Sequence, residues 1–148
     1  MSSEELRYEE TLNIEASADS VWQAITSPAV VSQYFIVPLV QMDLTMGGDI
    51  VYGSAAKPLI SGTVLALETN VTLVHTFIFT AIHPGVQSED LSRVTYHLEE
   101  IEQGIALHFV HDHFGDDRAT HDAIADGWPV ILSRLKAQAE GRELPAFT

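Results

Sequence analysis

The chain of 148 residues contains no cysteine and few basic residues. The absence of cysteine excludes disulfide bonds and thiolate metal sites. Seven Lys and Arg stand against 21 Asp and Glu, which gives a formal net charge of −14, and the seven are scattered from Arg7 to Arg142. Because nucleic acid and anionic membrane surfaces repel such a charge, we expect no nucleic-acid partner and no membrane insertion.

Long apolar runs are missing as well. No segment approaches the roughly 20 consecutive apolar residues of a membrane-spanning helix. The opening MSSEELRYEE has neither the basic end nor the apolar stretch of a signal peptide, so a cytoplasmic location is the default expectation. The length fits one domain over residues 1–148, which is long enough to bury about 68–70% of its unfolded surface.

The first half of the chain changes its periodicity twice. Apolar and polar residues alternate along LRYEETLNIEA (residues 6–16), as they do in a half-buried strand. Two short segments with helical spacing follow, SADSVWQAI with Ser17 as its N-cap and TSPAVVSQYF with Pro28 at the first helical position. From Ile36 to His113 the pattern predicts six more strands separated by turns.

The last part of the chain is amphipathic with helical spacing from Asp116 to about Glu140, which predicts a long helix whose start Asp116 or Asp117 can cap. Pro129 lies inside this span, so we expect a kink or break near Asp126–Pro129. Successive strands joined by short turns favour an antiparallel sheet, and the helix must cover its apolar face. The predicted fold class is therefore α+β.

Several short motifs resemble those of one family in their order and spacing: VWQAITSP, YF, GGDI, SGTV, LVHTF, RVTYHLE, HDHF and DGWPVILSRLKAQAEG. Over roughly Tyr8 to Gly141, the chain resembles the branch of the START-like (SRPBCC) superfamily that is related to the activator of the heat shock protein 90 ATPase. This resemblance implies a helix-grip fold, in which a curved seven-stranded antiparallel sheet grips a long C-terminal helix. It also implies a cavity between sheet and helix, where superfamily relatives hold lipids, sterols or polyketides and some act as cyclases or aromatases.

Polar residues interrupt the apolar faces of three predicted strands. Alternation in LHFVHDHF places His111 and His113 on the same side as Phe109, which should face the helix. The same alternation in VTLVHTFIF turns His75 inward, and Glu10 falls on the apolar side of the first strand. We therefore expect Glu10, His75, His111 and His113 to point toward a largely apolar interior.

Three interpretations of these polar residues are open. His111 and His113 could ligate a metal together with His121 or Asp117, but there is no second histidine pair, so we expect no metal site. Glu10 and a histidine of the last strand, His111 or His113, could form an acid–base pair, which makes Glu10 and His111 the catalytic candidates. Alternatively, these groups satisfy one another or orient the polar end of a ligand.

The sequence contains no phosphate-binding loop, dinucleotide fingerprint or nucleophile elbow, so no cofactor is expected. Our first hypothesis is a binding protein for a small apolar ligand; the alternatives are an enzyme of the cyclase, aromatase or hydrolase type and a chaperone-interacting module, and a homodimer stays open. Each inward aromatic residue taken alone is more often plain core than pocket lining. The residues expected to line the cavity are Phe35, His75, Phe77, Phe79, Tyr96, Phe109, His111, Trp128 and Leu132.

Overall fold

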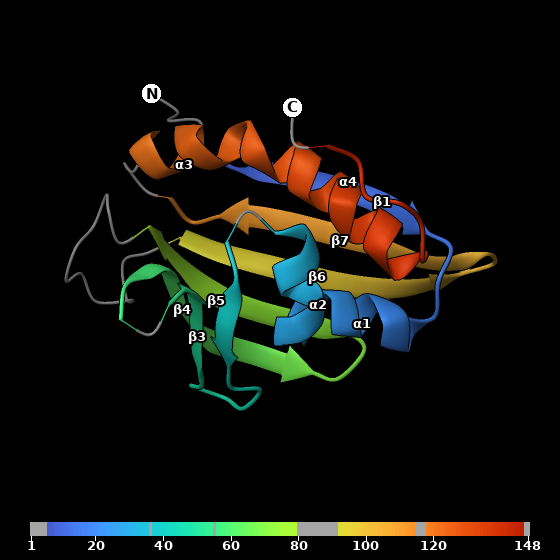
Figure 1. Cartoon of the computed structure of the whole chain (residues 1–148), viewed down its shortest axis with the longest axis horizontal. Coiled ribbons are helices and arrows are strands. Elements are labelled where there is room, and N and C mark those ends of the chain that lie inside the picture. The colour runs from blue at the N-terminus through green and yellow to red at the C-terminus, as the bar shows by residue number, and fades with distance from the viewer. Residues whose placement is uncertain (1–5, 36, 55, 80–91, 115–117, 147–148) are drawn as a thin grey trace, which may run out of the picture.

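The structure, a computed structural model, describes residues 6–35, 37–54, 56–79, 92–114 and 118–146. Figure 1 shows the helices on one side of a curved sheet, with the last two helices nearly end to end. In chain order the elements are β1 (Tyr8–Ile14), α1 (Ala18–Thr26), α2 (Pro28–Tyr34), β2 (Leu39–Met42), β3 (Asp49–Gly53), β4 (Pro58–Glu68), β5 (Thr72–Phe79), β6 (Ser92–Ile101), β7 (Gly104–Asp112), α3 (Arg118–Ala125) and α4 (Gly127–Ala139).

The seven strands form one antiparallel sheet in the order β1-β7-β6-β5-β4-β3-β2. The first strand therefore pairs with the last, as in the helix-grip topology, and β1 and β2 form the two edges. The inward residues of the sheet and the buried faces of the helices make up a single hydrophobic cluster. The predicted α+β helix-grip fold is confirmed.

The two short helices form where the capping signals predict them. The Ser17 hydroxyl accepts a hydrogen bond from the Ser20 amide at the start of α1, and Pro28 lies in the first turn of α2. The hydroxyl of Tyr34 donates to the Ala24 carbonyl, and Arg134 Nε donates to the Tyr34 carbonyl. These bonds tie α1, α2 and α4 together over the sheet.

The C-terminal helix is broken, as the position of Pro129 predicts. Helix α3 ends at Ala125 and α4 begins at Gly127. Pro129 has no N–H to donate to the carbonyl four residues earlier, and its ring crowds that carbonyl. The residue concerned is Ala125, where α3 ends. The caps expected at Asp116 or Asp117 lie outside the described residues.

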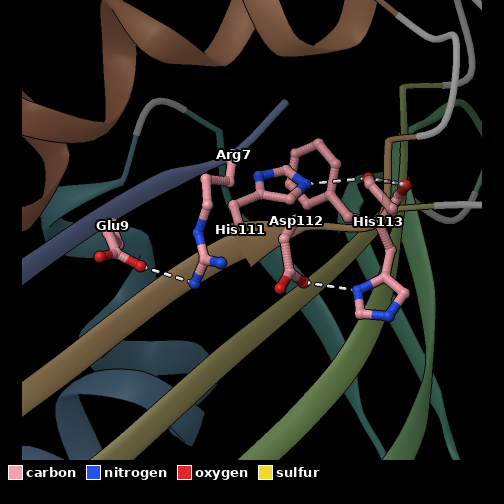
Figure 2. A network of polar contacts seen from close by, with 7 residues as sticks. Arg7, Glu9, His111, Asp112 and His113 are labelled. Carbon is pink, nitrogen blue, oxygen red and sulfur yellow. Dashed lines mark hydrogen bonds and ion pairs between the residues drawn. The ribbon is translucent and has the colours of Figure 1, made fainter. Parts of the chain in front are cut away.

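His113 departs from the alternation that predicts an inward side chain. Strand β7 ends at Asp112, and His113 adopts a left-handed backbone conformation with φ of 62°. Its side chain is about half exposed (52%), and its Nδ1 lies 2.8 Å from the Asp112 carboxylate. Figure 2 shows the ring of His113 turned away from that of His111. The prediction that both histidines face the interior is wrong, because the strand stops one residue too early.

No helix among the described residues is long and apolar enough to cross a membrane.

Candidate ligand-binding site

Two buried histidines lie on the inward face of the sheet, on strands β5 and β7, with β6 between them. Val94 of β6 pairs with His111 of β7 on one side and with His75 of β5 on the other. His111 is fully buried and His75 is 3% exposed. The strand alternation that predicts their inward placement is thus consistent with the structure, and their surroundings differ sharply.

His111 has a hydrogen-bond partner at each ring nitrogen. Trp128 Nε1 donates to Nδ1 over 3.0 Å, and Nε2 lies 2.9 Å from the hydroxyl oxygen of Ser92. Because indole can only donate, Nδ1 must be the acceptor, so the imidazole is neutral and carries its proton on Nε2. The Ser92 hydroxyl then donates to the Phe77 carbonyl over 3.1 Å.

This chain of hydrogen bonds is continuous from helix to sheet. It links α4 to β7, then to β6 and β5 (Figure 2, where a dashed line leaves the His111 ring). Buried polar groups that are all satisfied rigidify a core and stabilise one arrangement of it. His111 is therefore best explained as a structural residue that fixes the register of α4 on the sheet.

Only one ring nitrogen of His75 forms a hydrogen bond with a described residue. Its Nδ1 donates to the Thr76 carbonyl over 2.7 Å, which leaves the lone pair of Nε2 as an acceptor. Burial lowers the pKa of His75 to about 4, outweighing the opposite effect of the hydrogen bond to Thr76. Gly62 makes this approach possible, since a Cβ atom there would lie 2.1 Å from the Thr76 oxygen. Within the described residues, no hydrogen-bond partner reaches Nε2.

Three tyrosines, Tyr34, Tyr52 and Tyr96, are buried near one another in the interior. The rings of Tyr96 and His75 have centroids 6.2 Å apart. Burial raises the pKa of Tyr96 well above its usual value, and the nearby Tyr52 and Tyr34 raise it further. The Tyr34 hydroxyl is bound to Ala24, but the hydroxyls of Tyr52 and Tyr96 have no hydrogen-bond partner in the part of the chain that the structure describes. We refer to Tyr52, His75 and Tyr96 as the Tyr–His cluster.

A small apolar cavity lies beneath the joint between α3 and α4, and none of the three cluster residues lines it. Its volume is about 30 Å³, room for about one water molecule. Phe35 stacks on Tyr52 with centroids 4.8 Å apart, and Phe77 follows His75 on the same face of β5. The lining residues are Phe35, Ile60, Phe77, Phe79, Ala123, Ile124, Gly127, Trp128 and Ile131.

The cavity residues predicted from the sequence divide into three groups. Phe35, Phe77, Phe79 and Trp128 line the cavity. His75 and Tyr96 belong to the Tyr–His cluster and do not line the cavity. Phe109, His111 and Leu132 are packed in the core, where the rings of Phe109 and Trp128 have centroids 4.5 Å apart.

Tyr52 and Ser92 were missed, although a sequence signal exists for each. Tyr52 alternates with Ile50 in DIVYG, and Ser92 alternates with Val94 in LSRVTYHL. Both therefore have the inward parity of their strands. Ile60, Ile124 and Ile131 were missed because nothing in their apolar pattern distinguishes cavity lining from ordinary core.

Glu10 faces inward but has a different partner from the one expected. It is half-buried opposite Phe109, and its carboxylate accepts a hydrogen bond from the hydroxyl of Tyr8. Burial raises the pKa of Tyr8, and Glu10 raises it further. The expected pairing of Glu10 with a histidine is wrong, because Tyr8 lies two residues away on the same face and both nitrogens of His111 are bound elsewhere. The structure does not assemble the acid–base pair.

No group of three or more His, Asp or Glu among the described residues is placed to hold a metal ion. His121 and Asp122 pair with each other at 3.0 Å on α3. Asp117 lies outside the described residues.

A larger hollow of about 600 Å³ lies at the other end of α4, and it is open to solvent. Its buried carboxylate is already satisfied, since Glu140 accepts from the Glu15 amide and pairs with Arg142 at 2.6 Å. The hollow therefore offers mainly exposed charges of both signs.

Solved structures share this fold over most of their length. Protein MLL2253 from Mesorhizobium loti is 21% identical with a TM-score of 0.75, covering 93% of this chain and 99% of its own. The Aha1 dimer from Colwellia psychrerythraea is 18% identical with a TM-score of 0.73, covering 90% and 96%. An HSP90 activator from Plasmodium falciparum is 16% identical with a TM-score of 0.68, covering 83% and 87%. No curated protein matches the chain.

A family model, described as Activator of Hsp90 ATPase homolog 1-like protein, matches residues 15–140. This span includes both short helices, strands β2 to β7 and both C-terminal helices. The chain therefore belongs to the family of proteins that resemble the activator of the Hsp90 ATPase, as its motifs predict.

Proposed function

We propose that this protein binds a small, largely apolar molecule between the sheet and the joint of α3 and α4. The observation that carries the proposal is a cavity lined by apolar residues, with the buried side chains of Tyr52, His75 and Tyr96 nearby, whose outer polar atoms bind no described residue. None of these three atoms is among the fully buried atoms that lack a partner, so each borders a space that a water molecule or a ligand group can reach. If these positions served only to fill the core, Phe and Leu would do so without polar atoms that need hydrogen-bond partners.

Entry of a ligand requires α3 to move. Ligand pockets usually measure about 300 Å³ or more, so the cavity of about 30 Å³ must expand. The break at Asp126 separates α3 from α4, and Ile124 is the only large apolar side chain that α3 buries among the described residues. A shift of α3 would open the cavity while α4, fixed through Trp128 and His111, stays in place.

Naphthalene is a suitable first probe because it is apolar and flat. We expect it to shift amide signals of α3 and of the residues around the cavity in a saturable way in two-dimensional NMR spectra. A large side chain at Ala123, which lines the cavity, should weaken binding at least about tenfold, equivalent to about 1.4 kcal/mol.

The matched control is Ala119, which is exposed on the same helix like Ala123 but does not line the cavity. Ala119→Trp should bind naphthalene like the original chain, whereas Ala123→Trp should not. The proposal fails if naphthalene causes no saturable shifts, or if the two variants weaken binding equally.

A second candidate function is interaction with a chaperone. Val40, Leu44 and Met46 are 43%, 39% and 66% exposed on the edge strand β2 and the loop after it. Apolar side chains that together form one exposed patch are typical of a protein contact surface, and one of the similar folds is an HSP90 activator. If this candidate is correct, the chain raises the ATPase rate of an Hsp90 chaperone and Met46→Asp abolishes the increase. An unchanged ATPase rate would rule it out.

A further inference from the structure

The Tyr–His cluster has a defined set of unused hydrogen-bonding groups. His75 Nδ1 is committed to the Thr76 carbonyl, so Nε2 can only accept. The hydroxyls of Tyr52 and Tyr96 can each donate and accept, and no described residue binds either of them. The cluster thus offers one obligatory acceptor and two donors to a ligand group that comes within reach of them.

A hydroxyl group matches this set. Its hydrogen can go to Nε2 of His75, while its oxygen accepts from one or both tyrosine hydroxyls. A carbonyl oxygen could accept from the tyrosines but would leave Nε2 without a donor. An ammonium group could donate to Nε2, but the tyrosine hydrogens would have no acceptor on it. Of the three groups compared, only the hydroxyl can both donate to Nε2 and accept from the tyrosines.

The surroundings select a neutral group. Burial lowers the pKa of His75 to about 4, so the imidazole is uncharged near neutral pH. The buried polar side chains among the described residues include no Lys or Arg. A ligand carboxylate would therefore lose its hydration without a compensating positive charge, which is costly in an apolar interior. The net charge of −14 also opposes the approach of an anion.

The apolar part of the ligand must lie against aromatic side chains. Phe35 stacks on Tyr52, while the rings of Phe77 and Trp128 have centroids 6.1 Å apart on the cavity wall. Flat rings pack well between such faces. A ring system that lies against Phe35 and Phe77 would direct a hydroxyl group toward their neighbours Tyr52 and His75.

We propose that Tyr52, His75 and Tyr96 form the polar subsite of this pocket and select a neutral hydroxyl group on a cyclic apolar ligand, such as a phenol. This inference rests on the proposed ligand-binding function and specifies its chemistry. Three related probes separate the two: naphthalene has no polar group, 2-naphthol carries the hydroxyl, and 2-naphthoate is an anion of similar shape.

The experiment measures the dissociation constants of all three probes by NMR titration at pH 7. For the original chain, 2-naphthol should bind about tenfold more tightly than naphthalene, as expected for one or two satisfied hydrogen bonds. 2-Naphthoate should bind more weakly than 2-naphthol by at least about tenfold. Tyr96→Phe and His75→Leu should each reduce the preference for 2-naphthol over naphthalene severalfold.

Tyr34→Phe is the matched control. Tyr34 is as deeply buried as Tyr96, but its hydroxyl is already bound to the Ala24 carbonyl over 2.5 Å. It should leave the ratio of the two dissociation constants unchanged. The ratio is compared within each variant, so a general loss of stability does not imitate the effect. If His75→Leu does not fold, Tyr52→Phe replaces it in the comparison.

The outcomes are distinguishable. If naphthalene and 2-naphthol bind equally, the polar subsite is wrong while the proposed function stands. If 2-naphthol is preferred but neither Tyr96→Phe nor His75→Leu changes the preference, the hydroxyl binds elsewhere and the inference is overturned. If no probe binds, the proposed function fails and the inference fails with it.

Discussion

Two sites flank Val94 on the inward sheet face, here called the His111 end and the His75 end, and each buries a histidine in a different way. At the His111 end, an imidazole is buried and both of its nitrogens have partners in Trp128 and Ser92. At the His75 end, one strand away from Val94, an equally buried imidazole keeps a free acceptor beside two tyrosine hydroxyls without partners. The two histidines are therefore opposite tautomers, with the proton on Nε2 in His111 and on Nδ1 in His75.

The difference separates a structural polar network from a binding one. A network whose groups are all hydrogen-bonded stabilises the fold. Removing one member leaves its partner buried without a hydrogen bond, which costs the desolvation free energy of that partner. A cluster with unused groups gives little to stability and keeps its hydrogen bonds for a ligand. Substitutions at the two ends should thus have opposite profiles, with stability lost at the His111 end and binding lost at the His75 end.

The largest effect on stability is expected at Trp128. It is 3% exposed, packs against Phe109 and donates to His111. Trp128→Ala should lower the free energy of unfolding by about 3–5 kcal/mol, as deletions of large buried aromatics do. Denaturant titration measures it. A loss below about 1 kcal/mol would show that α4 presents another face to the sheet.

The next largest effect is expected in the pH dependence of the unfolding free energy, which reports on His75. Its pKa is about 4 in the folded protein, compared with an ordinary value of 6.5. Between pH 4 and pH 6.5, His75 is therefore protonated in the unfolded chain but not in the folded chain. This contribution is fully present above pH 6.5 and is lost as the pH falls toward 4, by about 3 kcal/mol at most.

The measurement compares unfolding free energies at several pH values in the original chain and in His75→Leu. The variant should lose less stability on acidification by about this amount, whereas the exposed His97→Gln should behave like the original chain. Identical pH profiles in all three proteins would mean that His75 is charged or exposed in the folded state.

The smallest effects give the sharpest contrast between the two ends. Ser92→Ala removes the partner of His111 Nε2 and should cost about 1–3 kcal/mol. Tyr96→Phe removes a buried hydroxyl that has no described partner, and its effect should lie within about 1 kcal/mol of zero without added ligand. If Tyr96→Phe costs as much as Ser92→Ala, the Tyr96 hydroxyl is a structural group and the comparison between the ends collapses.

Much of the fold follows from local pattern. Strand alternation and capping signals predict the order of elements, the inward placement of His75 and His111, and the break before Pro129. These features depend on neighbours in sequence, so the sequence carries them directly.

The partners of the inward polar groups could not be predicted in the same way. Whether Glu10 meets Tyr8 or a histidine depends on side-chain packing between strands, and a single left-handed residue removed His113 from the interior. The size of the cavity depends on how closely Phe77, Trp128 and Ile124 fit together, which no period in the sequence records. Whether an inward histidine has hydrogen-bond partners at both ring nitrogens also depends on side-chain packing, so the sequence pattern does not show it.

The most direct test is the ¹⁵N NMR signal of the two imidazoles with and without saturating 2-naphthol. Without the probe, we expect the Nε2-protonated tautomer for His111 and the Nδ1-protonated tautomer for His75. On binding, Nε2 of His75 should shift as it accepts the hydrogen of the probe, while both nitrogens of His111 stay unchanged. A shift at His111 with none at His75 would contradict the account.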